Sequence, residues 1–316
     1  MKNKSNATNK ERYGRGPIAR KVIAAYRQHL AQKVINMADW REAKMNAESL
    51  QTSVISNSKL SEYDPLHWLY VFGQNQLSIL VEQILVIPAL RKLAYAYENA
   101  EDEYLPSGPP MSPLTYSYFF SWSTFDLCSS GAKKESFCTI VTDLCKFQKV
   151  DEGLTSLFET MQASRMGIYR HEGVSGKFVL LRELITNQEI KAISPAGYLG
   201  VQGEIWFARV LPPPIQSEVL DYSVVFTTPY VLGRYIPERG FYPLVENEWL
   251  AYFSRTLPKI KAETRELAYG LLMKYGLSRN YWNEYIFLSY RNYQNDMILL
   301  QGFPDIRASL PHADLA

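Results

Sequence analysis

Between residues 165 and 228 the chain changes from helical periodicity to short segments rich in β-branched and aromatic residues, and this change constrains the fold most. Each segment is bounded by Gly, Asn or Pro, which is typical of strands joined by turns. Five short strands in about 65 residues predict a small SH3-like or OB-like β-barrel. We expect the strands at 166–171, 177–184, 188–193, 204–210 and 222–228.

On both sides of these strands, apolar residues recur every three or four positions, as they do in amphipathic helices. Asp64 and Pro65 have the residue types of a helix N-cap and first turn, and Pro88 is expected to break that helix. The chain is therefore predicted to be α+β, mostly helical, with the barrel inserted between helical segments. Helices are expected near 17–50, 65–87, 89–99, 114–127, 134–147, 151–163, 246–257, 259–275 and 279–293, and a last strand within 297–303.

A Pro-rich segment gives the clearest boundary. Four prolines and one glycine within residues 106–113 predict a loop or linker. The expected organisation is a basic disordered tail, an N-terminal helical domain, the linker, a helical segment, the barrel and a C-terminal helical part, at 1–16, 17–104, 105–113, 114–164, 165–235 and 236–316.

The formal net charge of +2 hides an uneven distribution. Residues 1–33 hold nine basic residues and one acid, whereas the rest of the chain has a net charge of −6. Basic side chains neutralise phosphates and release counterions, so the N-terminus is a candidate for weak nucleic-acid contact, the alternative being a solvated tail. We expect this segment to be detachable from the fold. The candidate residues are Lys10, Arg12, Arg15, Arg20, Lys21 and Arg27.

No sequence motif indicates catalysis or a cofactor. The chain lacks G-x-S-x-G, Walker A, H-E-x-x-H and G-x-G-x-x-G. An enzyme stays an alternative: a hydrolase or metal-dependent nuclease with a site assembled from His171, Glu172, Glu189 and Lys191. Glu189 and Lys191 have the E-x-K spacing of restriction-type nucleases. Alternation in a half-exposed strand produces the same triplet, however, so this spacing is not specific.

Cysteine usage and hydropathy bear on the compartment. Three cysteines form neither a disulfide framework nor closely spaced zinc-binding pairs, which favours a reducing compartment and no metal site. The most apolar long segment, 77–96, contains Glu82, Pro88, Arg91 and Lys92, so we interpret it as a buried helix rather than a membrane span. The expectation is a cytoplasmic protein without membrane contact.

Three stretches of the β-rich region carry a resemblance. Residues 165–169 (RMGIY), 179–185 (VLLRELI) and 203–211 (GEIWFARVL) are similar in layout to the barrel-like part of some SEC-C-containing bacterial hypothetical proteins. The likeness covers about 70 residues and extends toward Thr227–Val231. The zinc-binding cysteine motif of SEC-C is absent here, so the resemblance implies no metal and no activity. It implies a bacterial, cytoplasmic accessory protein.

Together these features favour a non-catalytic bacterial accessory or adaptor protein. It would bind an unidentified protein partner, and its basic N-terminus would add a weak, salt-sensitive nucleic-acid contact. The alternatives are the dispersed-site enzyme and an obligate structural subunit of a larger complex. The sequence specifies neither the partner nor the oligomeric state.

Overall fold

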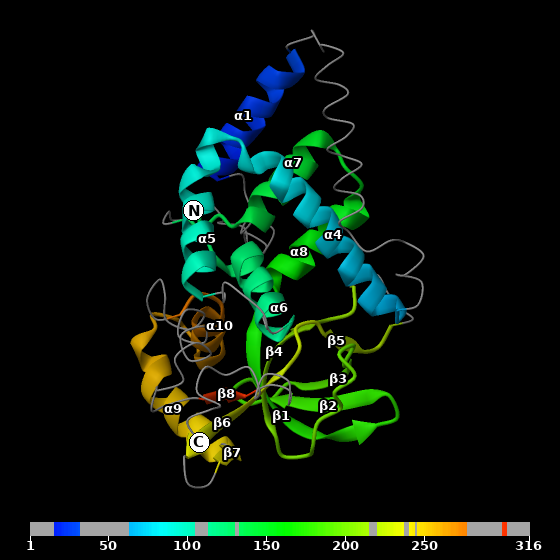
Figure 1. The fold of residues 1–316 in the computed structure, drawn as a ribbon, viewed down its shortest axis with the longest axis vertical. Helices are drawn as coiled ribbons and strands as arrows, with labels where there is room; N and C mark the ends of the chain where they lie inside the picture. Colours follow the sequence, from blue (N-terminus) through cyan, green and yellow to red (C-terminus); the bar gives the residue numbers. More distant parts are fainter. Residues whose placement is uncertain are drawn as a thin grey trace, which may run out of the picture. The chain divides into compact units, whose positions relative to one another are not determined.

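The computed structural model describes residues 16–31, 63–104, 113–129, 133–214, 220–236, 240–243, 245–276 and 299–301 (Figure 1). Within these ranges the fold is α+β, with helical segments on both sides of a closed five-stranded barrel, so the predicted fold class is confirmed. The chain divides into two compact units that alternate along the sequence. The first unit comprises Met1–Ala96 and Leu127–Gln162, and the second comprises Tyr97–Asp126 and Ala163–Ala316.

The first unit is helical. Within it, α1 packs against α7 and the short helix η2, and α4 packs against the same two elements. The start of α4 is as predicted, because the Asp64 side chain accepts a hydrogen bond from the Leu66 amide at 3.1 Å and Pro65 occupies the first turn. The helices are α1 (Pro17–Ala31), α4 (Pro65–Leu85), η2 (Pro88–Leu90), α7 (Phe137–Gln148) and α8 (Glu152–Ala163), while α5 (Arg91–Tyr104) begins here and continues into the second unit.

Helix α1 belongs to the core of this unit. Its side chains Ala19, Val22 and Ile23 are buried, on the side of the helix opposite Arg20 and Lys21. The expectation that residues 1–33 form a detachable segment is therefore wrong for the helical part, because its removal would uncover the apolar surface that α1 covers. Residues 1–15, 32–50 and 105–112, which include the predicted tail, the continuation of the first helix and most of the linker, lie outside the described residues.

The second unit contains the barrel. Its strands follow the order β1–β2–β3–β5–β4 and return to β1, so that every strand has two neighbours. The β3–β5 pair is parallel and the other four pairs are antiparallel. All five strands coincide with predicted segments: β1 (Met166–Ser175), β2 (Phe178–Glu183), β3 (Glu189–Ile193), β4 (Ile205–Leu211) and β5 (Ser223–Val225).

Three further strands extend the sheet beyond the ring. Strand β6 (Tyr230–Ile236) pairs with β4, and β7 (Gly240–Pro243) and β8 (Leu299–Gln301) both pair with β6. The strand predicted within 297–303 is therefore present as β8. No strand was predicted at β6 or β7, because the last expected strand of the barrel ended at residue 228.

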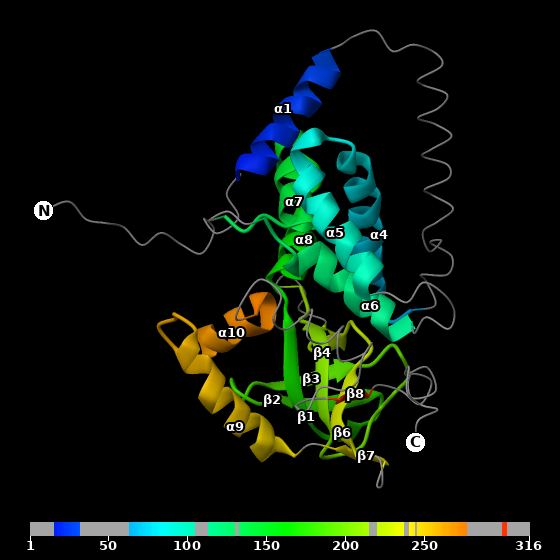
Figure 2. The same ribbon diagram turned by 60° about the vertical axis from the view of Figure 1, so that its left-hand side comes forward.

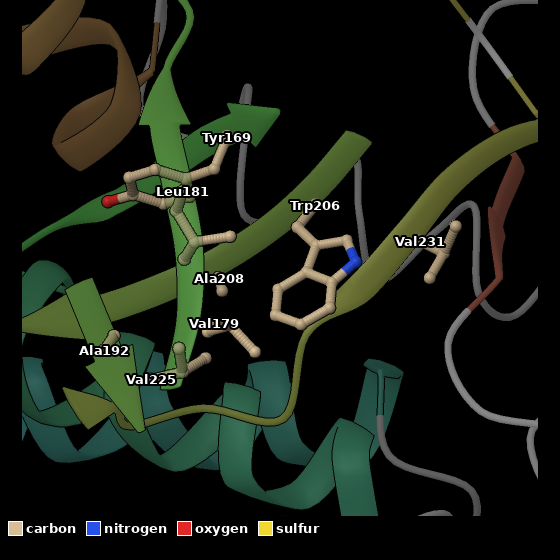
Figure 3. Close-up of a cluster of buried hydrophobic side chains, with 8 residues drawn as sticks. All are labelled: Tyr169, Val179, Leu181, Ala192, Trp206, Ala208, Val225 and Val231. Atoms are coloured by element: carbon tan, nitrogen blue, oxygen red, sulfur yellow. The ribbon is translucent and has the colours of Figure 1, made fainter. Parts of the chain in front are cut away.

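The barrel core is formed by side chains that alternate along the strands (Figure 3). Tyr169 of β1 lies opposite Trp206 of β4 in the register, and Trp206 is fully buried. Their partners are smaller residues, of which the last lies on the adjoining strand β6 and the others on the five barrel strands: Val179, Leu181, Ala192, Ala208, Val225 and Val231.

Helices at both ends of the second unit complete it. Helix α10 contacts β1 beside the barrel (Figure 2). It begins later than the predicted 259–275 helix, because the Thr264 side chain caps it by accepting a hydrogen bond from the Leu267 amide at 3.1 Å. Gly276 ends it with a positive φ of 74°, as predicted. The elements are α6 (Pro113–Ser121), the π-helical turn η3 (Trp122–Asp126), α9 (Glu246–Thr256), η4 (Leu257–Lys259) and α10 (Arg265–Tyr275), and the predicted 279–293 helix lies outside the described residues.

Candidate functional site

His171, the histidine of the dispersed-site hypothesis, points into the barrel. Its side chain is fully buried, its ring centroid is 4.9 Å from that of Trp206, and its Nε2 lies 2.8 Å from the Leu199 carbonyl oxygen. Burial lowers the pKa of His171, against the opposing influence of the Leu199 carbonyl and of Glu204. A neutral, enclosed imidazole of this kind packs the end of the barrel.

Glu172 follows His171 on the opposite side of the strand and joins a network of charges. It accepts hydrogen bonds from Arg170 Nη1 at 2.9 Å and from Arg182 Nε at 2.8 Å. Arg182 also donates to both carboxylate oxygens of Glu246 in α9, each at 3.0 Å. The half-buried network links β1 and β2 to α9, so each charge of Glu172 and Arg182 is matched within it.

Glu189 and Lys191 lie on β3 with the alternation expected of a half-exposed strand. Glu189 is exposed, and Lys191 binds Asp221 and lies with its ammonium 5.0 Å from the Phe178 ring centroid. In the β2–β3 register, Glu189 faces Arg182 on the outer side of the barrel, whereas His171 is inside. The structure thus separates His171 from the other three residues. Across the described ranges, no group of three His, Cys, Asp or Glu side chains could hold a metal ion.

The three cysteines, all within described ranges, form no disulfide. Cys138 and Cys145 are buried on α7, whereas Cys128 is half-buried. Burial raises the pKa of Cys145 to about 11, which keeps this thiol protonated at neutral pH.

A buried ionic cluster in the second unit has no signal in the sequence. Asp126 and Arg209 are fully buried and form an ion pair, and Lys274 Nζ lies 3.3 Å from the other oxygen of Asp126. Arg209 Nη1 and Lys274 Nζ also donate to the Ser164 carbonyl, at 3.0 and 2.8 Å. The cluster joins η3, β4, α10 and the start of β1. Its members are far apart in the chain, so no local motif could indicate it.

The nucleic-acid candidates fall into two groups. Lys10, Arg12 and Arg15 lie outside the described residues. Arg20, Lys21 and Arg27 lie on the exposed side of α1 with Ala24 and Gln28, at the spacing of one helical face. No acidic residue occurs in α1, so this face carries positive charge only.

Two lysines that the sequence did not single out adjoin the start of α1. Lys133 and Lys134 are exposed and directly precede Glu135, which is buried. The Glu135 carboxylate accepts hydrogen bonds from the Ile18 amide at 3.1 Å and from the Ala19 amide at 2.8 Å. It thereby satisfies two of the free amides at the start of α1, so that the two lysines directly before it lie near the N-terminal end of the helix.

Two more basic residues come from the corner between α4 and α5. Helix η2 packs against α1, and α5 begins immediately after η2 with Arg91 and Lys92, both exposed. We call these exposed cations, which come from α1 and from two segments joined to it by packing or by Glu135, the basic face, and all of them belong to the first unit: Arg20, Lys21, Arg27, Arg91, Lys92, Lys133 and Lys134. The sequence prediction did not include Arg91, Lys92, Lys133 and Lys134, because it considered only the segment with the highest density of basic residues.

None of the described helices is long and apolar enough to cross a membrane. The resemblance to SEC-C-containing proteins involves residues of β1, β2 and β4 and stays a prediction. Comparisons with protein-family models, with curated proteins and with solved structures give no match to this chain.

Proposed function

We propose that this chain is a non-enzymatic accessory protein that contacts nucleic acid through the basic face of its first unit. The observation that carries the proposal is the solvent side of α1, where Arg20, Lys21 and Arg27 are exposed together without an acidic neighbour on the helix. Lysines and arginines arranged in this way bind phosphates by releasing condensed counterions.

The proposed contact is electrostatic, and its strength therefore depends on salt. Each phosphate neutralised contributes a slope of about −0.9 in log affinity against log salt for duplex DNA. If most of the seven cations of the basic face take part, the slope is about −4 to −6. Binding of this kind has dissociation constants of about 10⁻⁴–10⁻⁶ M at physiological salt, which suits an accessory contact.

The test uses the full-length protein and a labelled 24-base-pair duplex of random sequence, followed by fluorescence polarisation at 50 and 200 mM salt. We expect R20Q/K21Q/R27Q to bind at least tenfold more weakly than the wild type at 50 mM salt. The matched control is K259Q/K261Q, which removes two exposed lysines of the second unit and should leave binding unchanged. Equal affinity of the triple variant and the wild type would overturn the proposal.

The accessory role is favoured over the enzyme by the position of His171, inside the barrel and away from Glu172, Glu189 and Lys191. Light scattering of the purified full-length chain distinguishes an accessory protein, which is stable without its protein partner, from an obligate structural subunit. An accessory protein is expected to be monodisperse with a defined mass when isolated. Aggregation of the isolated chain, relieved by co-expression with another subunit, would favour the obligate subunit instead.

A further inference from the structure

Resting on the proposed function, we infer that the ligand of the basic face is the phosphate backbone of a nucleic-acid duplex, bound without base readout. Three observations point to a duplex rather than to a single strand: the length of the basic row on α1, the origin of the cations in three segments, and the scarcity of exposed aromatic side chains on the face.

The row on α1 has a length that suits a regular backbone. Arg20 and Arg27 are seven residues apart on the same exposed side, which corresponds to about 10.5 Å along the helix axis. Successive phosphates of one strand of a duplex advance by about 3.4 Å along its axis, so the row spans about three nucleotides. A rigid helix matches a rigid backbone at this spacing without ordering either partner.

The other cations broaden the face beyond one row. Lys133 and Lys134 are fixed at the start of α1 by Glu135, and Arg91 and Lys92 follow η2, which packs against α1. Lys134 has a φ of 46°, a left-handed conformation that few non-glycine residues adopt. Cations held by three packed segments form a preorganised surface, which suits a stiff duplex rather than a flexible strand.

Several of these cations lie near helix N-termini, where the helix dipole disfavours positive charge. Arg20 and Lys21 lie near the N-terminus of α1, and Arg91 and Lys92 occupy the first turn of α5, where acidic side chains would be favourable. The acid nearest to the start of α1, Glu135, is buried and bound to backbone amides. Helix stability therefore does not account for this placement, whereas an anionic ligand does.

The basic face has few exposed aromatic side chains on which bases could stack. Over residues 17–28, the exposed side of α1 contains no aromatic residue, and the guanidinium of Arg27 covers the Phe147 ring at 4.5 Å from its centroid. Among the described residues, one large aromatic side chain, Tyr95, is classed as exposed, and its exposed fraction is 63%. Proteins that bind single strands stack successive bases on several aromatic side chains, and one tyrosine does not provide such a series.

The experiment compares four ligands with the full-length protein: duplex DNA, duplex RNA and single-stranded DNA of 24 nucleotides per strand, and vesicles containing anionic lipid. We expect both duplexes to bind at least tenfold more tightly than the single strand at 50 mM salt. K133Q/K134N should reduce the salt slope for duplex binding by about 2, because two phosphate contacts are lost. Asn is used at position 134 because it tolerates a positive φ.

Y95A is the matched variant for the stacking alternative, and it should leave duplex affinity within twofold of the wild type. Equal or tighter binding of the single strand, lost in Y95A, would overturn the duplex inference and leave the proposed function standing. Tighter binding to the vesicles would also overturn it. Failure of the wild type to bind any nucleic acid would overturn the proposed function itself.

Discussion

Asp126 and Arg209 show how much depends on single residues in the second unit. Both are fully buried, and Lys274 adds a second cation at 11% exposure. Removing one member of a buried ion pair leaves an uncompensated charge, which typically costs about 3–5 kcal/mol. We therefore expect D126N to lower the free energy of unfolding of this unit by about 3–5 kcal/mol, measured by urea unfolding.

A double-mutant cycle separates the pairing from the general cost of substitution. R209M replaces the cation with an apolar side chain of similar length, and in the D126N background it removes a charge that is already unpaired. We expect the double variant D126N/R209M to lose at least about 1 kcal/mol less than the two single losses combined. Strict additivity would show that the two charges do not interact in the folded protein.

Because His171 is buried, we expect the stability of the folded protein to depend on pH. Burial lowers its pKa in the folded protein below the ordinary value of 6.5, so below pH 6.5 the unfolded chain binds a proton that the folded chain resists. This contribution to stability is complete above pH 6.5 and is lost as the pH falls from there toward the lowered pKa. The midpoint of urea unfolding should therefore be lower at pH 5.5 than at pH 7.5, with a smaller difference in H171Q.

His67 supplies the control for this measurement. Burial also lowers its pKa, against the effect of Asp64, so H67Q should remove a separate part of the same pH dependence. The double variant H67Q/H171Q is expected to have the flattest profile. Parallel profiles of wild type and H171Q would exclude His171 as a source of the pH dependence.

At the scale of the element, α1 depends on a side chain from a remote loop. The Glu135 carboxylate takes the place of an N-cap, and a Cβ at Gly16 would overlap it. G16A should therefore displace Glu135 and lower the free energy of unfolding of the first unit by about 1–2 kcal/mol, the range of helix-capping losses. E135A should have a loss of similar size, since the same two amides lose their acceptor.

The combination of these two changes tests the contact. Because E135A removes the side chain that an alanine at position 16 would meet, G16A should cost little in that background. The cycle compares the thermal unfolding of the wild type, G16A, E135A and the double variant. A full additional loss from G16A in the E135A protein would mean that the glycine is required for another reason.

The five barrel strands could be predicted because their information is local. Their segments are rich in β-branched and aromatic residues, and the turns contain residues suited to positive φ, such as Gly176 at 60° and Asn187 at 55°. The starts of α4 and α10 depend on short-range caps at Asp64 and Thr264, and only the first was recognised. Because the Thr264 cap was not recognised, the predicted start at residue 259 lies six positions before α10 begins at Arg265.

The candidate site could be predicted only in part, because most of it is assembled across the chain. The exposed face of α1 follows from helical periodicity, so Arg20, Lys21 and Arg27 were found from the sequence. Lys133 and Lys134 are brought near the start of α1 because Glu135 beside them bonds to residues 116 and 117 positions away. No period or motif encodes such a contact, and the same holds for Asp126 with Arg209, which are 83 positions apart.

At the scale of the whole molecule, the two compact units share the chain in alternating pieces. The second unit takes Tyr97–Asp126 from the middle of the first and resumes at Ala163. The inserted piece supplies Asp126 to Arg209 and places Tyr118 with its ring centroid 5.4 Å from that of Phe207 on β4. The outer face of β4 is thus covered by a segment that ends 40 residues before β1 begins at Met166.

This interleaving predicts how fragments behave. Residues 165–235 include all five barrel strands but lack Asp126, and they also lack Tyr269, whose hydroxyl accepts a hydrogen bond from the Ile168 amide at 2.8 Å. The fragment would lack the segments that cover the outer face of β4 and the tyrosine that binds the Ile168 amide, so we expect it not to fold, giving a poorly dispersed amide spectrum by nuclear magnetic resonance. A fragment joining 97–126 through a flexible linker to 163–316 restores both contacts and should give dispersed amides. A dispersed spectrum from 165–235 alone would show that the barrel folds without its buried ionic cluster.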